Sequence, residues 1–329
     1  MDKTTPLEEE TISAFGKRLT KEVGIRLFLS EDPRGGELQE FCRRLSEMAP
    51  NIRTVEVADE AGPLPAILIG ERLRYCGVPA GNEIKPFLEA IAFLDETSIP
   101  ALDPLPDGFM ALETPADLQV FVTPFCNFCP AVVRRLLPLP FLVASIYLTV
   151  IDATLFPEIA AERNIKSAPT LVLDDHLRWT GRVDMEELAR AVVNRDPAML
   201  GNETLGRILQ TEGGAYELAG MMHRHEKIFP AFADLLTDER FTVRLAAMVT
   251  VEDLLERDGD LALQVVQPML KRYSQVADAV KGDFLYLLGE IKSAEALPLL
   301  QAASADPNAE IREAAAEALE KIDTDQPIG

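Results

Sequence analysis

Residues 120–130 read Val-Phe-Val-Thr-Pro-Phe-Cys-Asn-Phe-Cys-Pro, an apolar segment that leads into two cysteines separated by two residues. The β-branched and aromatic side chains at its start predict a short, buried parallel strand. An apolar pattern with helical spacing then begins at Cys129, and Pro130 suits the first turn of a helix because no helical hydrogen bond is lost there. We therefore interpret Cys126 and Cys129 as a redox dithiol between a strand and a helix.

Cys126 should lie just before the amino terminus of this predicted helix. Free backbone N–H groups and the helix dipole favour an anion at that place, so we expect its thiolate to form below the usual thiol pKa of about 8.5. Cys126 is then the candidate nucleophile. Cys129, one helical turn further on, is the candidate resolving thiol, and the two would form the redox disulfide Cys126–Cys129.

The chain after the dithiol alternates predicted strands and helices. The elements are a strand over 142–151, a helix over 155–164, a proline-led strand from 167 to 173, a strand at 178–181 and a helix over 184–193. This order resembles the thioredoxin fold. In that family a cis proline follows the dithiol at about the 43 residues that separate Pro169 from Cys126, and it packs against the dithiol. The resemblance implies that Pro169 and the backbone around Ala168 hold the substrate segment, because proline leaves neighbouring backbone groups free to pair.

Other side chains near the dithiol allow two explanations each. Phe125 and Phe128 bracket the nucleophile, where they are either exposed contacts for a docking substrate or part of the core. Arg134 and Arg135 follow on the predicted helix. They either help to hold the thiolate and steer acidic thiol proteins, or form a solvated helix face.

Two cysteines at this spacing also supply half of many zinc sites. A tetrahedral site needs two further ligands. The remaining candidates in the chain are Cys42, Cys76, His176, His223 and His225. None has a partner at suitable spacing in the predicted thioredoxin unit, so we predict no metal site and no bound cofactor. We expect Cys42 and Cys76 to be inert.

Residues 23–94 repeat the same pattern without its chemistry. Overlaying the first strands of the two units places Pro33 and Gly36 where Cys126 and Cys129 stand. The copy also lacks a helix between its second strand and its proline-led strand. We predict an abbreviated thioredoxin-like unit whose role is packing, sheet extension or partner contact.

An inert unit followed by a Cys-x-x-Cys-Pro unit resembles two related groups. These are the amino-terminal domain of the flavoprotein component of alkyl hydroperoxide reductase and the protein disulfide oxidoreductases of hyperthermophiles. The phrase Gly-Val-Pro-Ala-Gly-Asn-Glu at 77–83 belongs to this resemblance, which covers about residues 20–197. Many thioredoxins keep a buried carboxylate six residues before the first cysteine, where this chain has Val120. Proton transfer to Cys129 must therefore use water or another group.

The last third of the chain differs in its sequence pattern, with helical periodicity and many alanines and leucines. Three segments begin with an apolar–basic pair entering a helix, at Val243-Arg244, Val280-Lys281 and Ile311-Arg312, and their starts lie 37 and 31 residues apart. Periods in the thirties predict stacked helical hairpins, and residues 306–315 resemble the second helix of a HEAT repeat. We expect about four helix pairs over residues 200–323, forming a long surface on which a protein partner docks.

The predicted fold class is therefore α/β, with two tandem thioredoxin-like units followed by an all-α HEAT-like solenoid. The predicted domains are residues 1–114, 115–197 and 198–329. Counting Lys and Arg against Asp and Glu, they carry net charges of −9, −2 and −11, which give −22 for the chain. An acidic surface repels phosphate backbones, so we expect no nucleic-acid partner.

The start of the chain lacks the charged-then-apolar pattern of a signal sequence. Its most apolar stretch, residues 136–151, is interrupted by two prolines and is shorter than the roughly 20 residues that a membrane helix needs. We therefore expect a cytoplasmic protein without a membrane partner.

Two functions remain open. The first is a thiol–disulfide oxidoreductase of the thioredoxin type, which acts on protein disulfides or thiols, is reset by an external reductase and uses the helical repeats to dock its partner. The second is a binding or scaffold protein in which the dithiol is a redox sensor or a remnant. The sequence leaves open the redox partner, the direction of electron flow, the reduction potential and the oligomeric state.

Overall fold

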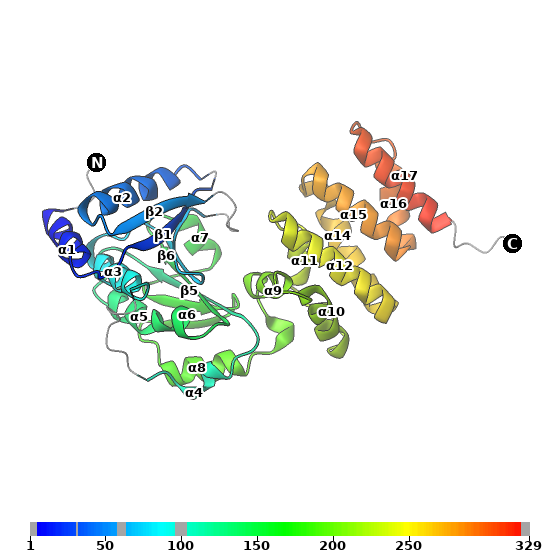
Figure 1. Cartoon of the computed structure of the whole chain (residues 1–329). Coiled ribbons are helices and arrows are strands. Elements are labelled where there is room, and N and C mark those ends of the chain that lie inside the picture. The colour runs from blue at the N-terminus through cyan, green and yellow to red at the C-terminus, as the bar shows by residue number, and fades with distance from the viewer. Residues whose placement is uncertain (1–4, 31, 58–63, 96–103, 324–329) are drawn as a thin grey trace. The chain divides into compact units, whose positions relative to one another are not determined.

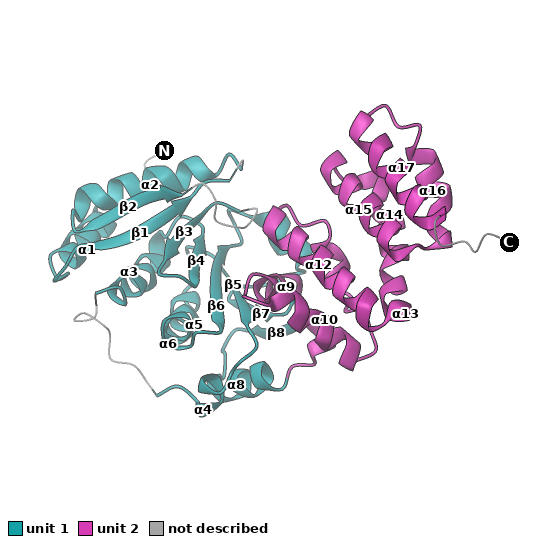
Figure 2. Ribbon diagram, turned by 45° about the vertical axis from the view of Figure 1, so that its right-hand side comes forward, with its two compact units in different colours: residues 1–194 teal, residues 195–329 magenta. Residues whose placement is uncertain are grey.

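A computed structural model of the chain describes residues 5–30, 32–57, 64–95 and 104–323 (Figure 1). Contacts divide the chain into two compact units, residues 1–194 and residues 195–329 (Figure 2). The first unit is built on a β-sheet and the second consists of helices. No described helix combines the length and the apolar character that crossing a bilayer requires.

One sheet runs through the whole first unit. Its strands are β1 (Val23–Phe28), β2 (Ile52–Val57), β3 (Ala66–Ile69), β4 (Leu73–Cys76), β5 (Ala116–Val122), β6 (Ile146–Asp152), β7 (Thr170–Leu173) and β8 (Leu177–Thr180). Their order is β2-β1-β3-β4-β6-β5-β7-β8. The parallel pairing of β4 with β6 joins the two thioredoxin-like halves, so the inert half lies beside the half that carries the dithiol.

The register of the two halves confirms that one repeats the other. In the first half, Phe28 of β1 pairs with Ala66, the residue after Pro65. In the second half, Phe121 of β5 pairs with the residue after Pro169. The proposed lack of a helix between β2 and β3 concerns residues 58–63, which lie outside the described part of the chain.

Helices cover both faces of this sheet. They are α1 (Pro6–Gly16), α2 (Gly35–Met48), α3 (Ile84–Ala92), α4 (Asp107–Met110), α5 (Cys129–Leu136), α6 (Pro138–Leu142), α7 (Pro157–Glu162) and α8 (Met185–Val193), with a short 3₁₀ turn, η1 (Gly81–Glu83), before α3. The large core holds side chains from every one of these α-helices except α7. On the opposite face, Phe156 and Ala160 from the α7 segment pack on Phe28 and Phe121. Figure 1 shows where α7 lies relative to the strands.

The prediction of a strand over 142–151 is wrong at its start. Leu142 ends α6, and β6 begins only at Ile146. Pro138 occupies the first turn of α6. A proline at that place suits a helix, because its missing N–H has no helical partner in any case.

In the inert half, an arginine occupies the turn that corresponds to the dithiol turn. Arg34 forms ion pairs with Asp32 and Glu158 and donates a hydrogen bond of 2.8 Å to the carbonyl of Leu155. Its guanidinium lies 4.2 Å from the centre of the Phe156 ring, and it lowers the pKa of Asp32 through a side-chain hydrogen bond. This turn thus links the two halves through Arg34, whereas the corresponding turn of the second half carries the dithiol.

The second unit repeats a short helix followed by a longer one. Its α-helices are α9 (Asn202–Leu209), α10 (Gly214–Arg224), α11 (Phe232–Leu235), α12 (Phe241–Arg257), α13 (Gly259–Ala262), α14 (Val266–Arg272), α15 (Asp278–Ile291), α16 (Leu297–Ala303) and α17 (Ala309–Asp323). The pairs α9–α10, α11–α12, α14–α15 and α16–α17 match the predicted number. In two of the predicted apolar–basic pairs, Arg244 and Arg312 donate to the carbonyls of Asp238 and Asp306, both six residues earlier at 2.8 Å.

Candidate active site

The dithiol lies in the turn between β5 and α5. Cys126 and Cys129 form a disulfide, with their Cα atoms 5.5 Å apart. Cys129 is the first residue of α5 and is fully buried, whereas Cys126 is half-buried and reaches the surface. Of the two sulfurs, only that of Cys126 is placed where another molecule can attack it or be attacked by it.

The first turn of α5 faces this sulfur. The backbone N–H of Cys129 points at Cys126 Sγ over 3.1 Å. The N–H groups of a first helical turn have no partner within the helix, so one aimed at sulfur favours a thiolate over a thiol. The predicted start of the helix at Cys129 is confirmed, and with it the placement of Cys126 just before that start.

The proline-led strand lies beside the dithiol. The Ala168–Pro169 peptide bond is cis, as the resemblance implied. Cys126 Sγ lies 3.7 Å from the carbonyl oxygen of Ala168, and the carbonyl of Pro169 accepts a hydrogen bond of 2.8 Å from Gly181. Cys126 and Ala168, which are 42 positions apart in the chain, therefore meet at the dithiol.

The aromatic residues that bracket the nucleophile are exposed. Phe125 is 88% exposed and Phe128 is 76% exposed. Packing in the core therefore does not account for these two side chains, and their role in docking a substrate remains a prediction.

The two arginines on α5 have partners other than the dithiol. Arg134 pairs with Glu89 of α3 at 2.6 Å, and Arg135 donates to the carbonyl of Val183 at 3.0 Å. Neither of these contacts holds the thiolate of Cys126.

The inert half contributes directly to the dithiol turn through η1. The backbone N–H of Asn82 donates to the carbonyl of Pro124 at 2.9 Å, and its side-chain amide donates to the carbonyl of Cys126 at 3.2 Å. Gly81 has a φ of +60°, and a Cβ added there would lie 2.6 Å from the Pro124 oxygen. The carboxylate of Glu8, on α1, accepts the N–H of Gly81 at 2.5 Å. The copy without the Cys-x-x-Cys dithiol thus supports the copy that has it.

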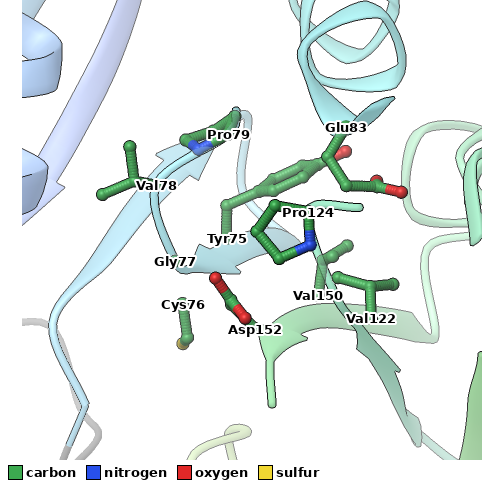
Figure 3. Close-up of a pocket in the computed structure, with 10 residues that line it drawn as sticks. All are labelled: Tyr75, Cys76, Gly77, Val78, Pro79, Glu83, Val122, Pro124, Val150 and Asp152. Carbon is green, nitrogen blue, oxygen red and sulfur yellow. The ribbon is translucent and has the colours of Figure 1, made fainter. Parts of the chain in front are cut away.

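Glu83 brings a buried carboxyl group to the same region. It is only 4% exposed, and it lines a cavity that Val122 and Pro124, the residues leading into the dithiol turn, also line (Figure 3). Burial raises its pKa to about 7; Arg134 acts in the opposite direction and Asp152 adds to the rise. Among the described residues, neither oxygen of this carboxyl group has a hydrogen-bond partner. A carboxyl group that exchanges its proton near neutral pH suits proton transfer.

No pattern in the sequence pointed to Glu83 as a site residue. The resemblance placed the expected carboxylate on the strand before the dithiol, where Val120 stands, whereas Glu83 comes from the other half of the sheet. The available signal was the phrase at 77–83, which ends in this glutamate and which belongs to the same resemblance.

The other candidates behave as structural groups. Cys42 and Cys76 are buried, and burial raises the pKa of Cys42 to about 12. The part of the chain that the structure describes contains no cluster of three or more His, Cys, Asp or Glu side chains suited to a metal ion.

Comparisons with known proteins agree with this architecture. Residues 116–194 match a thioredoxin domain and residues 266–328 match HEAT repeats. The F component of alkyl hydroperoxide reductase from Staphylococcus epidermidis is 26% identical over 163 residues, which are 49% of this chain and 32% of that protein. The matched region thus spans about a third of the length of that relative.

Two solved structures are also similar. The F component of alkyl hydroperoxide reductase from Enterococcus faecalis, as a C503A mutant, is 22% identical with a TM-score of 0.50 and covers 58% of this chain and 100% of that one. A protein disulfide oxidoreductase from Aeropyrum pernix is 18% identical with a TM-score of 0.47 and covers 57% of this chain and 92% of that one. The strand order, the dithiol turn and the family matches together show that this chain contains a thioredoxin-like domain with a close Cys126–Cys129 pair, and that HEAT repeats follow it.

Proposed function

We propose that this chain is a protein thiol–disulfide oxidoreductase that works through the Cys126–Cys129 dithiol and needs no bound cofactor. The observation that carries the proposal is the position of Cys126 Sγ. It is accessible, it receives the N–H of Cys129 over 3.1 Å, and it lies 3.7 Å from the Ala168 carbonyl. The similarity to the F component of alkyl hydroperoxide reductase supports redox chemistry of this kind.

The reaction transfers two electrons in two exchange steps. The Cys126 thiolate attacks one sulfur of a substrate disulfide, so that a mixed disulfide forms while the other substrate sulfur leaves as a thiolate and takes up a proton. Cys129 then loses its proton and attacks Cys126 Sγ. The second substrate thiol is released and the protein disulfide forms. An external dithiol or reductase restores the dithiol, and the same steps in reverse would oxidise a partner.

Glu83 is the group in this proposal that accepts the proton of Cys129. It takes the place of the strand carboxylate of other thioredoxins, and its pKa near 7 lets it accept and return a proton at neutral pH. After the second exchange, the proton passes on to the departing substrate thiolate, so protons and electrons balance.

The substrate in this proposal is a polypeptide. The exposed rings of Phe125 and Phe128 flank the nucleophile and offer apolar contacts. The backbone of Ala168 and Pro169 would hold the chain on either side of the substrate sulfur. The HEAT repeats would bind the protein that carries that sulfur, because stacked helical hairpins present a long surface to partners.

A trapping experiment tests the proposal. A Cys129→Ser variant should accumulate mixed disulfides with its protein substrates, because the resolving thiol is gone while the attacking one remains. A Cys126→Ser variant should form none and should reduce a test disulfide at least about a hundredfold more slowly than the parent. The measurements are non-reducing electrophoresis and the rate of thiol release.

Cys42→Ser serves as the matched control. Its thiol is buried, so this variant should keep the parental rate. If Cys126→Ser reduced the test disulfide as fast as the parent, the dithiol would not be the reactive group and the proposal would fail.

The second candidate is a binding protein in which the dithiol only senses redox state. The observation that favours it is the second unit, residues 195–329, which the exchange reaction itself does not use. Measuring the reduction potential of the Cys126–Cys129 pair distinguishes the oxidoreductase from the sensor. Catalytic pairs of this fold lie between about −120 and −270 mV and turn over with a cellular donor, whereas a pair that no donor reduces favours the sensor.

A further inference from the structure

A small cavity lies behind the dithiol turn, between the two halves of the sheet (Figure 3). Tyr75 and Glu83 line it from the inert half, and Val122, Pro124 and Asp152 line it from the other half. Its volume is about 20 Å³. A single water molecule needs roughly 10–15 Å³ measured in this way, so the cavity has room for one water and for nothing larger.

Two of the residues that line this cavity carry three buried polar atoms that have no hydrogen-bond partner among the described residues. They are the Tyr75 hydroxyl and both carboxyl oxygens of Glu83. Figure 3 shows the Tyr75 ring extending toward Glu83. Burial is the main cause that raises the pKa of Tyr75, and the negative charge of Glu83 raises it further. Buried polar groups in native proteins nearly always have a partner, either in the protein or in an ordered water.

We propose that the cavity binds one water molecule, which the Tyr75 hydroxyl and the Glu83 carboxylate share, and that Tyr75 is a positioning residue for Glu83. This inference rests on the proposed function for its catalytic meaning. The water gives the tyrosine and the carboxylate a common partner in a cavity whose other polar side chain is that of Asp152. It also places a mobile proton carrier beside Val122 and Pro124, where the dithiol turn begins.

The expected direction of the effect follows from electrostatics. A hydroxyl and a water that donate to a carboxylate stabilise its charged form and lower its pKa. Burial and the nearby Asp152 raise the pKa of Glu83, whereas Arg134 lowers it. Removing the hydroxyl should therefore raise the pKa of Glu83 and leave it protonated over more of the neutral range.

Tyr75→Phe in the full-length, oxidised protein tests this. The ring packs edge-to-face on Phe87 at 5.2 Å, and phenylalanine keeps that packing. The acid dissociation constant of Glu83 should fall about three- to tenfold, the range expected for one lost hydrogen bond. Infrared or carbon-13 titration of the carboxyl group measures it, with Glu83→Gln identifying the signal.

Tyr273→Phe is the matched control, because Tyr273 also has a buried hydroxyl without a partner among the described residues but lies in the second unit. It should leave the titration of Glu83 unchanged. In Tyr75→Phe, the pH profile of the step in which Cys129 resolves a mixed disulfide should move upward with the pKa of Glu83. An unchanged Glu83 titration in Tyr75→Phe would overturn the proposal.

A second measurement needs no variant. A high-resolution crystal structure of the parent should contain one ordered water within hydrogen-bond distance of Tyr75 and Glu83, and a dry cavity would overturn the proposal. Neither readout depends on turnover. If the parent protein fails to reduce disulfides, the proposed function is refuted while the proposed water site is unaffected. If the titration of Glu83 is unchanged in Tyr75→Phe, the water site is refuted while the proposed function is unaffected.

Discussion

Glu83 owes its chemistry to its surroundings rather than to its neighbours in the chain. It follows Gly81 and Asn82 in η1, two residues that hold the backbone of the dithiol turn. Its own side chain turns inward and is buried instead. Three consecutive residues of the inert half thus serve one site in two ways: by shaping the turn and by placing a carboxyl group behind it.

The burial of Glu83 should make folding depend on pH. Its pKa rises from 4.5 to about 7 in the folded protein, so the folded state holds this proton more tightly than the unfolded chain. This contribution is fully present below about pH 4.5 and is lost as the pH rises to about 7, at a cost of roughly 3 kcal/mol. Glu83→Gln should remove that fall, which urea unfolding at about pH 5 and pH 8 measures.

Glu186→Gln is the matched control for this prediction, because Glu186 is exposed and its substitution should leave the pH dependence as it is. If Glu83→Gln lost as much stability between the two pH values as the parent, the carboxylate would be better solvated than its burial indicates.

The residues that the sequence predicted are those with a local signal. Cys126 and Cys129 are recognisable because a strand and a helix start each leave a mark within about ten residues. A proline-led strand marks Pro169, and the thioredoxin resemblance implies its place beside the dithiol. Glu83 leaves only the phrase at 77–83 as a mark. The role proposed for it depends on the pairing of β4 with β6, a contact between halves of the chain that no short pattern encodes.

The contact between η1 and the dithiol turn depends on one glycine. Gly81 combines a φ of +60° with a Pro124 oxygen that would lie 2.6 Å from an added Cβ. Gly81→Ala should therefore destabilise the first unit by about 1–3 kcal/mol, since the side chain meets both a strained backbone and a clash. Thermal unfolding measures the loss.

Gly181→Ala separates the effect of backbone strain from the effect of the steric clash. Gly181 has a φ of +79° but nothing within 4 Å of the added Cβ, so its substitution should cost only the backbone strain of about 1 kcal/mol. An equal loss in the two variants would mean that the Pro124 carbonyl gives way, and that η1 does not fix the turn.

Each unit of the chain has its own hydrophobic core. The cores of the first unit draw on residues between Ile12 and Val192, and that of the second on residues between Ala198 and Ile322. Sequence periodicity predicted both units because strand alternation and helical repeats differ in period. Sheet extension was one of three roles predicted for the first half, and the single sheet confirms it; the sequence did not give the strand order, which is set by contacts across the whole unit.

Separate cores predict that the chemistry survives without the repeats. Every residue assigned to the dithiol site lies in residues 1–194, which form a compact unit. That segment alone should reduce a small aromatic disulfide within about twofold of the full-length rate, because domains with their own cores fold independently. A protein substrate trapped by full-length Cys129→Ser should be trapped far less by the same variant of the segment. If the segment trapped that protein equally well, the repeats would not select the substrate; if it lost the small-disulfide reaction as well, the dithiol site would need residues beyond Asn194.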